Sequence, residues 1–168
     1  MSDVHLVSIG GGAISLTHRP KLKDFSTLRA EGVTHVVTLL AETEGARQLG
    51  EAATRAGLGW IWVPFHGGAV PAPERTQELR QVLRQLSAIV EGGGKLVIHC
   101  SAGIHRTGMF GYALLRQLGL SAEAARARLA ELRQVTAEGV GPDRLAWGDA
   151  LVEPWSWVDS TGRRNTRN

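Results

Sequence analysis

The sequence predicts an α/β protein with a central, mostly parallel sheet of four to five strands and helices on both faces. Short runs rich in β-branched residues alternate with longer amphipathic segments, which is the order that a parallel sheet requires. The 168 residues, of which 43% are hydrophobic, suit one domain with a substantial core. We expect this domain to cover residues 1–152, followed over 153–168 by a tail that Trp155 and Trp157 partly anchor.

The expected strands are short apolar runs bounded by glycine, proline or polar residues. They cover Val4 to Ile9, Ala13 to Leu16, Val33 to Leu40, Trp60 to Val63 and Leu96 to Ile98. The glycines at positions 10–12 join the first two runs, and they lack the Gly-Lys-Ser/Thr that follows a nucleotide-binding loop. We therefore predict a hairpin for the first pair and intervening helices for the other strands.

The expected helices carry apolar side chains at helical spacing and start at residues that favour a helix N-terminus. They begin near Asp24, Glu42, Pro73, Arg106, Ser121 and Pro142, and they end near Gly32, Ala56, Val90, Leu118, Leu132 and Leu151. The segment from Met109 to Leu118 is apolar on nearly all sides, which is typical of a fully packed central helix.

Composition excludes several classes of protein. The net charge of +3 comes without a basic stripe or a nucleic-acid motif, so we expect no nucleic-acid partner. No apolar run reaches the length of a membrane span and no secretory signal is apparent. The six histidines lack the spacing of metal ligands, so we expect neither a metal nor a cofactor. The single cysteine fits a reducing cytoplasm; the oligomeric state is left open.

The stretch from Lys95 to Gly108 has the residues of a phosphate site. A predicted strand leads into Cys100, five residues follow, and Arg106 opens the next helix. A loop that enters a helix points its backbone N–H groups at one place, where the helix dipole favours an anion. The same field favours a thiolate over a thiol. The planar guanidinium of Arg106 can hold two phosphate oxygens at once.

These residues resemble the signature of the cysteine-dependent protein tyrosine phosphatases, His-Cys-x-x-Gly-x-x-Arg-Ser/Thr, and the element order is similar to that of the small dual-specificity-type enzymes. The fixed positions are His99, Cys100, Gly103, Arg106 and Thr107. The resemblance implies a phosphocysteine intermediate on Cys100, transition-state binding by Arg106, a Thr107 hydroxyl that stabilises the leaving thiolate, and structural support from His99. The implied phosphate-binding loop is Ser101, Ala102, Gly103, Ile104, His105 and Arg106.

The chain departs from the family pattern at the general acid. These enzymes usually carry an aspartate in a mobile loop some thirty residues before the cysteine, whereas the loop here, from Val63 to Pro71, holds neither Asp nor Glu. Relatives that read Asp-Gly-Gly at this place align their acid with His66. We therefore predict His66 as the acid; the alternatives are water and a more distant carboxylate such as Glu74.

Three functions are compatible with these residues. The leading prediction is a protein tyrosine or dual-specificity phosphatase that acts on a phosphorylated protein. The loop between Cys100 and Arg106 lacks the lysines of phosphoinositide-type relatives. However, some relatives linked to inositol phosphates have a histidine directly before the arginine, as this chain has at His105. An inositol-phosphate or phosphoinositide phosphatase is therefore the second reading. A catalytically weak phosphate-binding module is the third, because the usual aspartate is missing.

Overall fold

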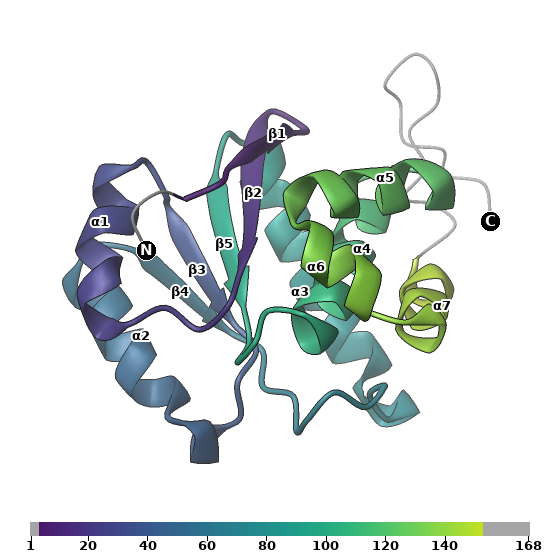
Figure 1. Cartoon of the computed structure of the whole chain (residues 1–168), viewed down its shortest axis with the longest axis horizontal. Coiled ribbons are helices and arrows are strands. Elements are labelled where there is room, and N and C mark those ends of the chain that lie inside the picture. Colours follow the sequence, from purple (N-terminus) through teal and green to yellow (C-terminus); the bar gives the residue numbers. More distant parts are fainter. Residues whose placement is uncertain (1–3, 153–168) are drawn as a thin grey trace.

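The computed structural model describes residues 4–152 and contains a five-stranded sheet in the order β1-β2-β5-β3-β4 (Figure 1). The strands are β1 (Val7–Ile9), β2 (Gly12–Thr17), β3 (His35–Thr38), β4 (Gly59–Trp62) and β5 (Lys95–His99). Strand β1 is antiparallel to β2 and the other pairs are parallel. The predicted fold class is thus confirmed, including the hairpin at the start of the chain.

Strand β5 is the centre of the sheet. It pairs with β2 on one side and with β3 on the other, and Thr17, Thr38 and His99 lie in register at the carboxyl ends of the three strands. The side chains of Leu96 and Ile98 are completely buried, as expected for a strand covered on both faces. The chain therefore leaves β5 at the middle of one sheet edge, where α/β proteins bind ligands.

Helices cover both faces of the sheet. Figure 1 shows α1 and α2 on one side and α3 to α7 on the other. Their bounds are α1 (Phe25–Ala30), α2 (Ala46–Arg55), α3 (Thr76–Glu91), α4 (His105–Gln117), α5 (Ala122–Leu132), α6 (Gln134–Gly139) and α7 (Pro142–Leu151). Ten residues of α4 are buried, among them Met109, Phe110 and Tyr112 without any exposure, which confirms the predicted central helix.

The observed helices differ from the predicted ones in two details. The segment from Glu42 to Ala56 is not one helix, because Gly45 takes a left-handed conformation with φ of +85° and separates the 3₁₀ helix Glu42–Glu44 from α2. The short helix α6 was not predicted, since its six residues carry no helical stripe of apolar side chains. Both irregularities place residues at the carboxyl ends of the strands, where the candidate site lies.

The predicted tail, with Trp155 and Trp157, lies outside the residues that the structure describes. Within residues 4–152, no helix is both long enough and apolar enough to cross a membrane.

Candidate active site

Cys100 directly follows β5 and precedes a loop that enters α4 at His105. The residue is only 3% exposed, although Ser101 and Ala102 beside it are exposed. The side chain therefore lies at the bottom of the loop, beneath the N-terminus of a long helix, where partial positive charge gathers.

The loop from Ser101 to Gly103 is held by its carbonyl oxygens. Ser101 O accepts from the backbone N–H of Arg19 at 2.9 Å. Arg133 Nη1 donates to Ala102 O and Gly103 O at 3.1 and 2.8 Å, and the Thr136 hydroxyl also donates to Gly103 O. Because outside donors bind these carbonyls, the loop is held in place just before the N-terminus of α4.

Gly103 is the one position in this loop that permits no side chain. Its φ is +73°, a conformation that favours glycine, and a Cβ atom there would lie 2.4 Å from the carbonyl oxygen of Thr17. The loop thus packs directly on the backbone at the end of β2, which explains why the predicted signature needs glycine here.

Thr107 lies on the first turn of α4 and is completely buried. Its hydroxyl donates to Cys100 Sγ at 3.1 Å. A hydrogen bond to sulfur stabilises the thiolate more than the thiol, since the negative charge makes a better acceptor. The structure therefore brings together the two residues that the signature pairs.

Arg106 is buried, and the side chain of Glu44 orients its guanidinium. Nη1 and Nη2 donate to the two oxygens of Glu44 at 2.7 and 3.0 Å, and Nη1 also donates to Phe65 O at 3.1 Å. The hydrogen bonds from Arg106 hold the pKa of Glu44 below its ordinary value although burial opposes this. Pairing with Glu44 raises the pKa of Arg106 in turn.

Glu44 was missed by the sequence analysis. It lies in the segment that the sequence predicts to be a continuous helix, and in such a helix a glutamate is expected to face solvent. The signal that marks it is Gly45, whose left-handed conformation ends the 3₁₀ helix just after β3. Arg19, also missed, donates to Glu44 O and so links this turn to the loop at Ser101.

The loop that carries His66 is bound at three carbonyl groups by three arginines. Arg75 Nη1 donates to Pro64 O at 2.7 Å, Arg106 to Phe65 O, and Arg144 Nε to Gly68 O at 2.6 Å. A Cβ atom on Gly68 would lie 3.2 Å from the Cβ of His105, so this loop packs against the loop that follows Cys100. His66 itself is exposed, and Glu74 lies in the 3₁₀ helix Pro73–Arg75.

His99 is completely buried one residue before Cys100. Burial lowers its pKa to about 4, so the imidazole is neutral at pH 7. Its Nδ1 lies 3.1 Å from Cys100 O and its Nε2 lies 2.8 Å from the hydroxyl of Thr38. Both ring nitrogens thus have partners inside the protein.

This burial makes stability depend on pH. Because the pKa of His99 is lower in the folded than in the unfolded chain, the unfolded chain binds more protons between about pH 6.5 and 4, and acid in this range favours unfolding. We expect the free energy of unfolding to fall by about 2–3 kcal/mol from pH 7 to pH 4.5 through His99 alone.

Urea unfolding of the wild type and of His99→Gln at both pH values measures this loss. Burial also lowers the pKa of His35, so the difference between the two proteins, rather than the wild-type slope, isolates His99. Equal pH dependence in the two proteins would contradict the assignment of a neutral, buried imidazole.

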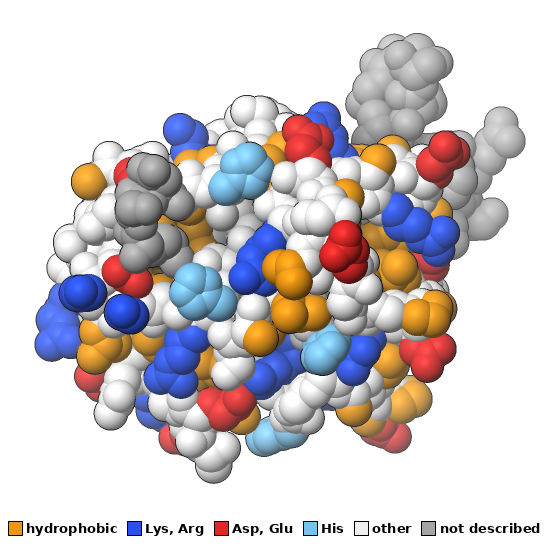
Figure 2. All heavy atoms as spheres, viewed as in Figure 1, with side chains coloured by type: hydrophobic (Ala, Val, Ile, Leu, Met, Phe, Trp, Pro, Cys, Tyr) orange, Lys and Arg blue, Asp and Glu red, His pale blue; other side chains and the backbone are white. Residues whose placement is uncertain are grey.

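The described elements define a class of protein. A cysteine after a central parallel strand, a short loop that enters a helix N-terminus and an arginine on the first turn of that helix make up the site of a cysteine-dependent phosphatase. In the lower centre of Figure 2, Lys, Arg and His side chains gather where β5 ends in Figure 1, which suits an anionic substrate.

Comparison with known families agrees with this class. The chain belongs to the family described as "Polymorphic toxin system, DSP-PTPase phosphatase", whose model matches residues 11–119. It is therefore a small cysteine-dependent phosphatase of the tyrosine and dual-specificity type, as the sequence analysis predicted. No curated protein matches the chain significantly in sequence.

Solved structures of phosphatases have the same fold. The active form of Tk-PTP is 25% identical, with a TM-score of 0.65 over 86% of this chain and 92% of that one. A putative protein tyrosine phosphatase from Leishmania major is 20% identical, with a TM-score of 0.65 and coverage of 87% and 96%. The catalytic core of the PP-IP phosphatase SIW14 from S. cerevisiae is 17% identical, with a TM-score of 0.58 and coverage of 85% and 82%.

Proposed function

We propose that the protein hydrolyses phosphomonoesters of phosphorylated proteins through a phosphocysteine intermediate on Cys100. The observation that carries this proposal is the buried Cys100 thiol that accepts from Thr107 next to an arginine oriented by Glu44. The proposed catalytic domain is residues 1–152, and a reducing cytoplasm is its proposed location, because the mechanism depends on a free thiolate.

The reaction proceeds in two displacements. The Cys100 thiolate attacks phosphorus, the bond from phosphorus to the ester oxygen breaks, and the leaving oxygen takes a proton from the general acid. Water then attacks the phosphocysteine and gives its proton back to the deprotonated general acid, and phosphate is released as the S–P bond breaks. Thr107 donates to the sulfur as it regains its negative charge, and the loop amides bind the phosphoryl oxygens throughout.

Arg106 retains the two donors that this mechanism needs. A guanidinium has five N–H groups, and Glu44 and Phe65 O accept from both groups on Nη1 and one on Nη2. The remaining N–H groups are on Nε and Nη2, and they lie parallel along one edge of the plane. This edge can bind two equatorial phosphoryl oxygens at once, while Glu44 keeps the plane fixed.

The choice of substrate depends on the exposed side chains of the loop. Ser101, Ala102 and His105 are exposed and none of them is a permanent cation, which favours a singly phosphorylated group such as phosphotyrosine. Two observations support an inositol-phosphate phosphatase as the alternative function. These are His105 and the fold shared with a PP-IP phosphatase.

The test is a panel of substrates. We expect turnover of p-nitrophenyl phosphate and of phosphotyrosine peptides at rates well above those for inositol phosphates, in equal buffers and at matched concentrations. A preference for inositol phosphates would instead identify an inositol-phosphate or phosphoinositide phosphatase. Binding of phosphopeptides without turnover of any ester would identify a phosphate-binding module and overturn the proposed activity.

We further propose His66 as the general acid. Its loop packs on the phosphate-binding loop at Gly68 and His105, and Gly67, with φ of +72°, gives the loop a flexible point beside His66. An alkyl phosphate needs the proton on its leaving oxygen far more than an aryl phosphate does. We therefore expect His66→Ala to slow alkyl phosphate hydrolysis by about 10²-fold or more, with a much smaller effect on p-nitrophenyl phosphate.

Rates for both esters across pH 5–9 decide the point, and Glu74→Gln is the matched variant for the rival acid. His66→Asp, which places the family's usual acid at this position, should restore hydrolysis of the alkyl phosphate. If His66→Ala slows both esters equally and weakly, or if Glu74→Gln shows the selective loss, His66 is not the acid.

A further inference from the structure

Three polar side chains form a hydrogen-bonded row across the sheet beneath the site. Trp60 on β4 donates its indole N–H to Thr38 Oγ1 on β3 at 2.9 Å. Thr38 Oγ1 lies 2.8 Å from His99 Nε2 on β5, and His99 Nδ1 lies 3.1 Å from Cys100 O. Thr38 and His99 are opposite each other in register and completely buried, so water does not compete for the bonds that His99 makes.

The chemistry of the end groups fixes every proton in this row. Cys100 O can only accept, so His99 Nδ1 must donate to it. Because burial keeps the imidazole neutral, Nε2 then carries no proton and must accept from the Thr38 hydroxyl. The Trp60 indole can only donate, and it occupies a lone pair on the Thr38 oxygen. Each group can therefore donate or accept in only one way, and every hydrogen bond of the row runs from donor to acceptor in the direction from Trp60 to Cys100.

We propose that Trp60 and Thr38 are positioning residues that hold His99 in its Nδ1–H tautomer and thereby orient the peptide group between Cys100 and Ser101. Cys100 O and the N–H of Ser101 belong to the same planar peptide. A donor fixed on that carbonyl therefore fixes the direction of the first amide of the phosphate-binding loop. In the other tautomer, the Nδ1 lone pair would face Cys100 O and turn the peptide away.

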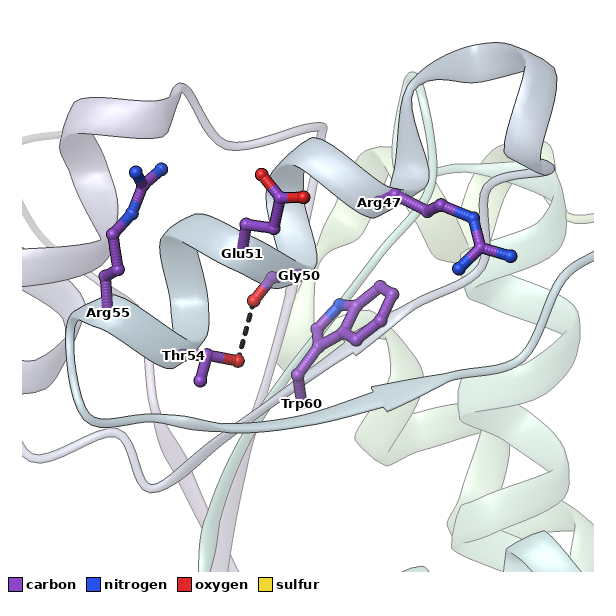
Figure 3. Close-up of a pocket in the computed structure, with 6 residues that line it drawn as sticks. All are labelled: Arg47, Gly50, Glu51, Thr54, Arg55 and Trp60. Carbon is purple, nitrogen blue, oxygen red and sulfur yellow. Dashed lines mark hydrogen bonds between the residues drawn. The ribbon is translucent and has the colours of Figure 1, made fainter.

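The packing of Trp60 supports a fixed indole. Figure 3 shows its ring rising from β4 to α2 beside Gly50, with Glu51 and Arg55 pointing away from it. A Cβ atom on Gly50 would lie 2.6 Å from the ring, so glycine is required in the middle of this helix for the ring to approach. The ring lines a surface hollow of about 520 Å³. Because β4 is the edge strand of the sheet, the row begins at the outer edge.

Trp62 provides a matched control on the same strand. Its ring stacks on Trp60 with centroids 5.7 Å apart, and its indole donates to Leu40 O at 2.8 Å. Replacement by phenylalanine removes one indole N–H from either residue, but only Trp60 belongs to the row that ends at Cys100. The two variants therefore separate loss of the row from loss of an aromatic ring system at the sheet edge.

The experiment combines NMR of His99 with steady-state kinetics. In ¹⁵N-labelled wild-type protein we expect the His99 proton on Nδ1, and in Thr38→Val a mixture of tautomers. We expect Trp60→Phe and Thr38→Val to lower kcat for p-nitrophenyl phosphate about 5- to 10-fold, Thr38→Ser to restore the wild-type tautomer and rate, and Trp62→Phe to change kcat by less than about twofold.

The proton of wild-type His99 on Nε2, or equal losses of kcat in Trp60→Phe and Trp62→Phe, would overturn the inference. The proposal rests on the proposed role of Cys100, and the two can fail separately. If the wild type shows no turnover, the proposed function fails while the tautomer measurement still tests the row. If turnover is normal and the tautomer does not respond to Thr38→Val, the row alone fails.

Discussion

Replacement of Cys100 by serine is expected to abolish turnover while phosphate binding survives. The serine hydroxyl is not ionised in the field that favours a thiolate, so kcat for p-nitrophenyl phosphate should fall by about 10⁴- to 10⁶-fold. The loop carbonyls remain bound to Arg19, Arg133 and Thr136 in the variant, which keeps the amides in place. Titration calorimetry of both proteins with inorganic phosphate, which neither can hydrolyse, should therefore give an affinity for the variant close to that of the wild type.

A second measurement addresses the intermediate. Rapid acid quenching of the wild type during turnover, followed by mass spectrometry, should find a phosphoryl group on Cys100 and none in the serine variant. Steady-state turnover by Cys100→Ser at a rate within tenfold of the wild type would rule out covalent catalysis by this residue. Thermal unfolding of the two proteins checks that the variant retains its fold.

Arg106→Lys is expected to have the second largest effect. A lysine ammonium is a single point charge. The guanidinium of Arg106 donates to Glu44 along one edge of its plane, and in the proposed mechanism it donates to phosphate along another. We expect kcat to fall by about 10³-fold or more, because bidentate binding to the equatorial oxygens is strongest in the transition state.

Arg116→Lys is the matched control for this substitution. Arg116 is also largely buried and donates to Asp149 at 2.9 Å, but its partners are Asp149 on α7 and the carbonyl of Leu120 in the segment after α4. The control should keep the wild-type kcat. Glu44→Gln keeps the shape of the partner of Arg106 but removes its charge. Its kcat should lie between those of Arg106→Lys and Arg116→Lys. Near-normal turnover by Arg106→Lys would restrict Arg106 to a structural role.

Much of the site was predictable because its chemistry is local in sequence. Cys100 and Arg106 belong to one loop and one helix start, and such a short segment has few conformations once Gly103 and the flanking elements are fixed. Strand β5 was equally clear, since a strand buried on both faces is a continuous apolar run. In both cases neighbouring residues carry the whole signal.

The remaining parts of the site depend on contacts between distant segments. Glu44 meets Arg106 across 62 positions of the chain, and only the turn at Gly45 marks it. Arg133 reaches the loop from the end of α5, where an arginine reads as a surface residue. The pairing of Thr38 with His99 follows from the order of strands β3 and β5, which periodicity does not give. Propensity identifies elements, but register and strand order decide which side chains meet.

The loop after Cys100 separates recognition of the phosphoryl group from recognition of what carries it. In the proposed mechanism backbone amides bind the phosphoryl group, and within this loop the backbone of Thr17 leaves no room for a side chain at Gly103. The exposed side chains of Ser101, Ala102 and His105 can then change without moving an amide. New substrate preferences are therefore within reach of single substitutions that leave the chemistry intact, and this division makes the loop evolvable.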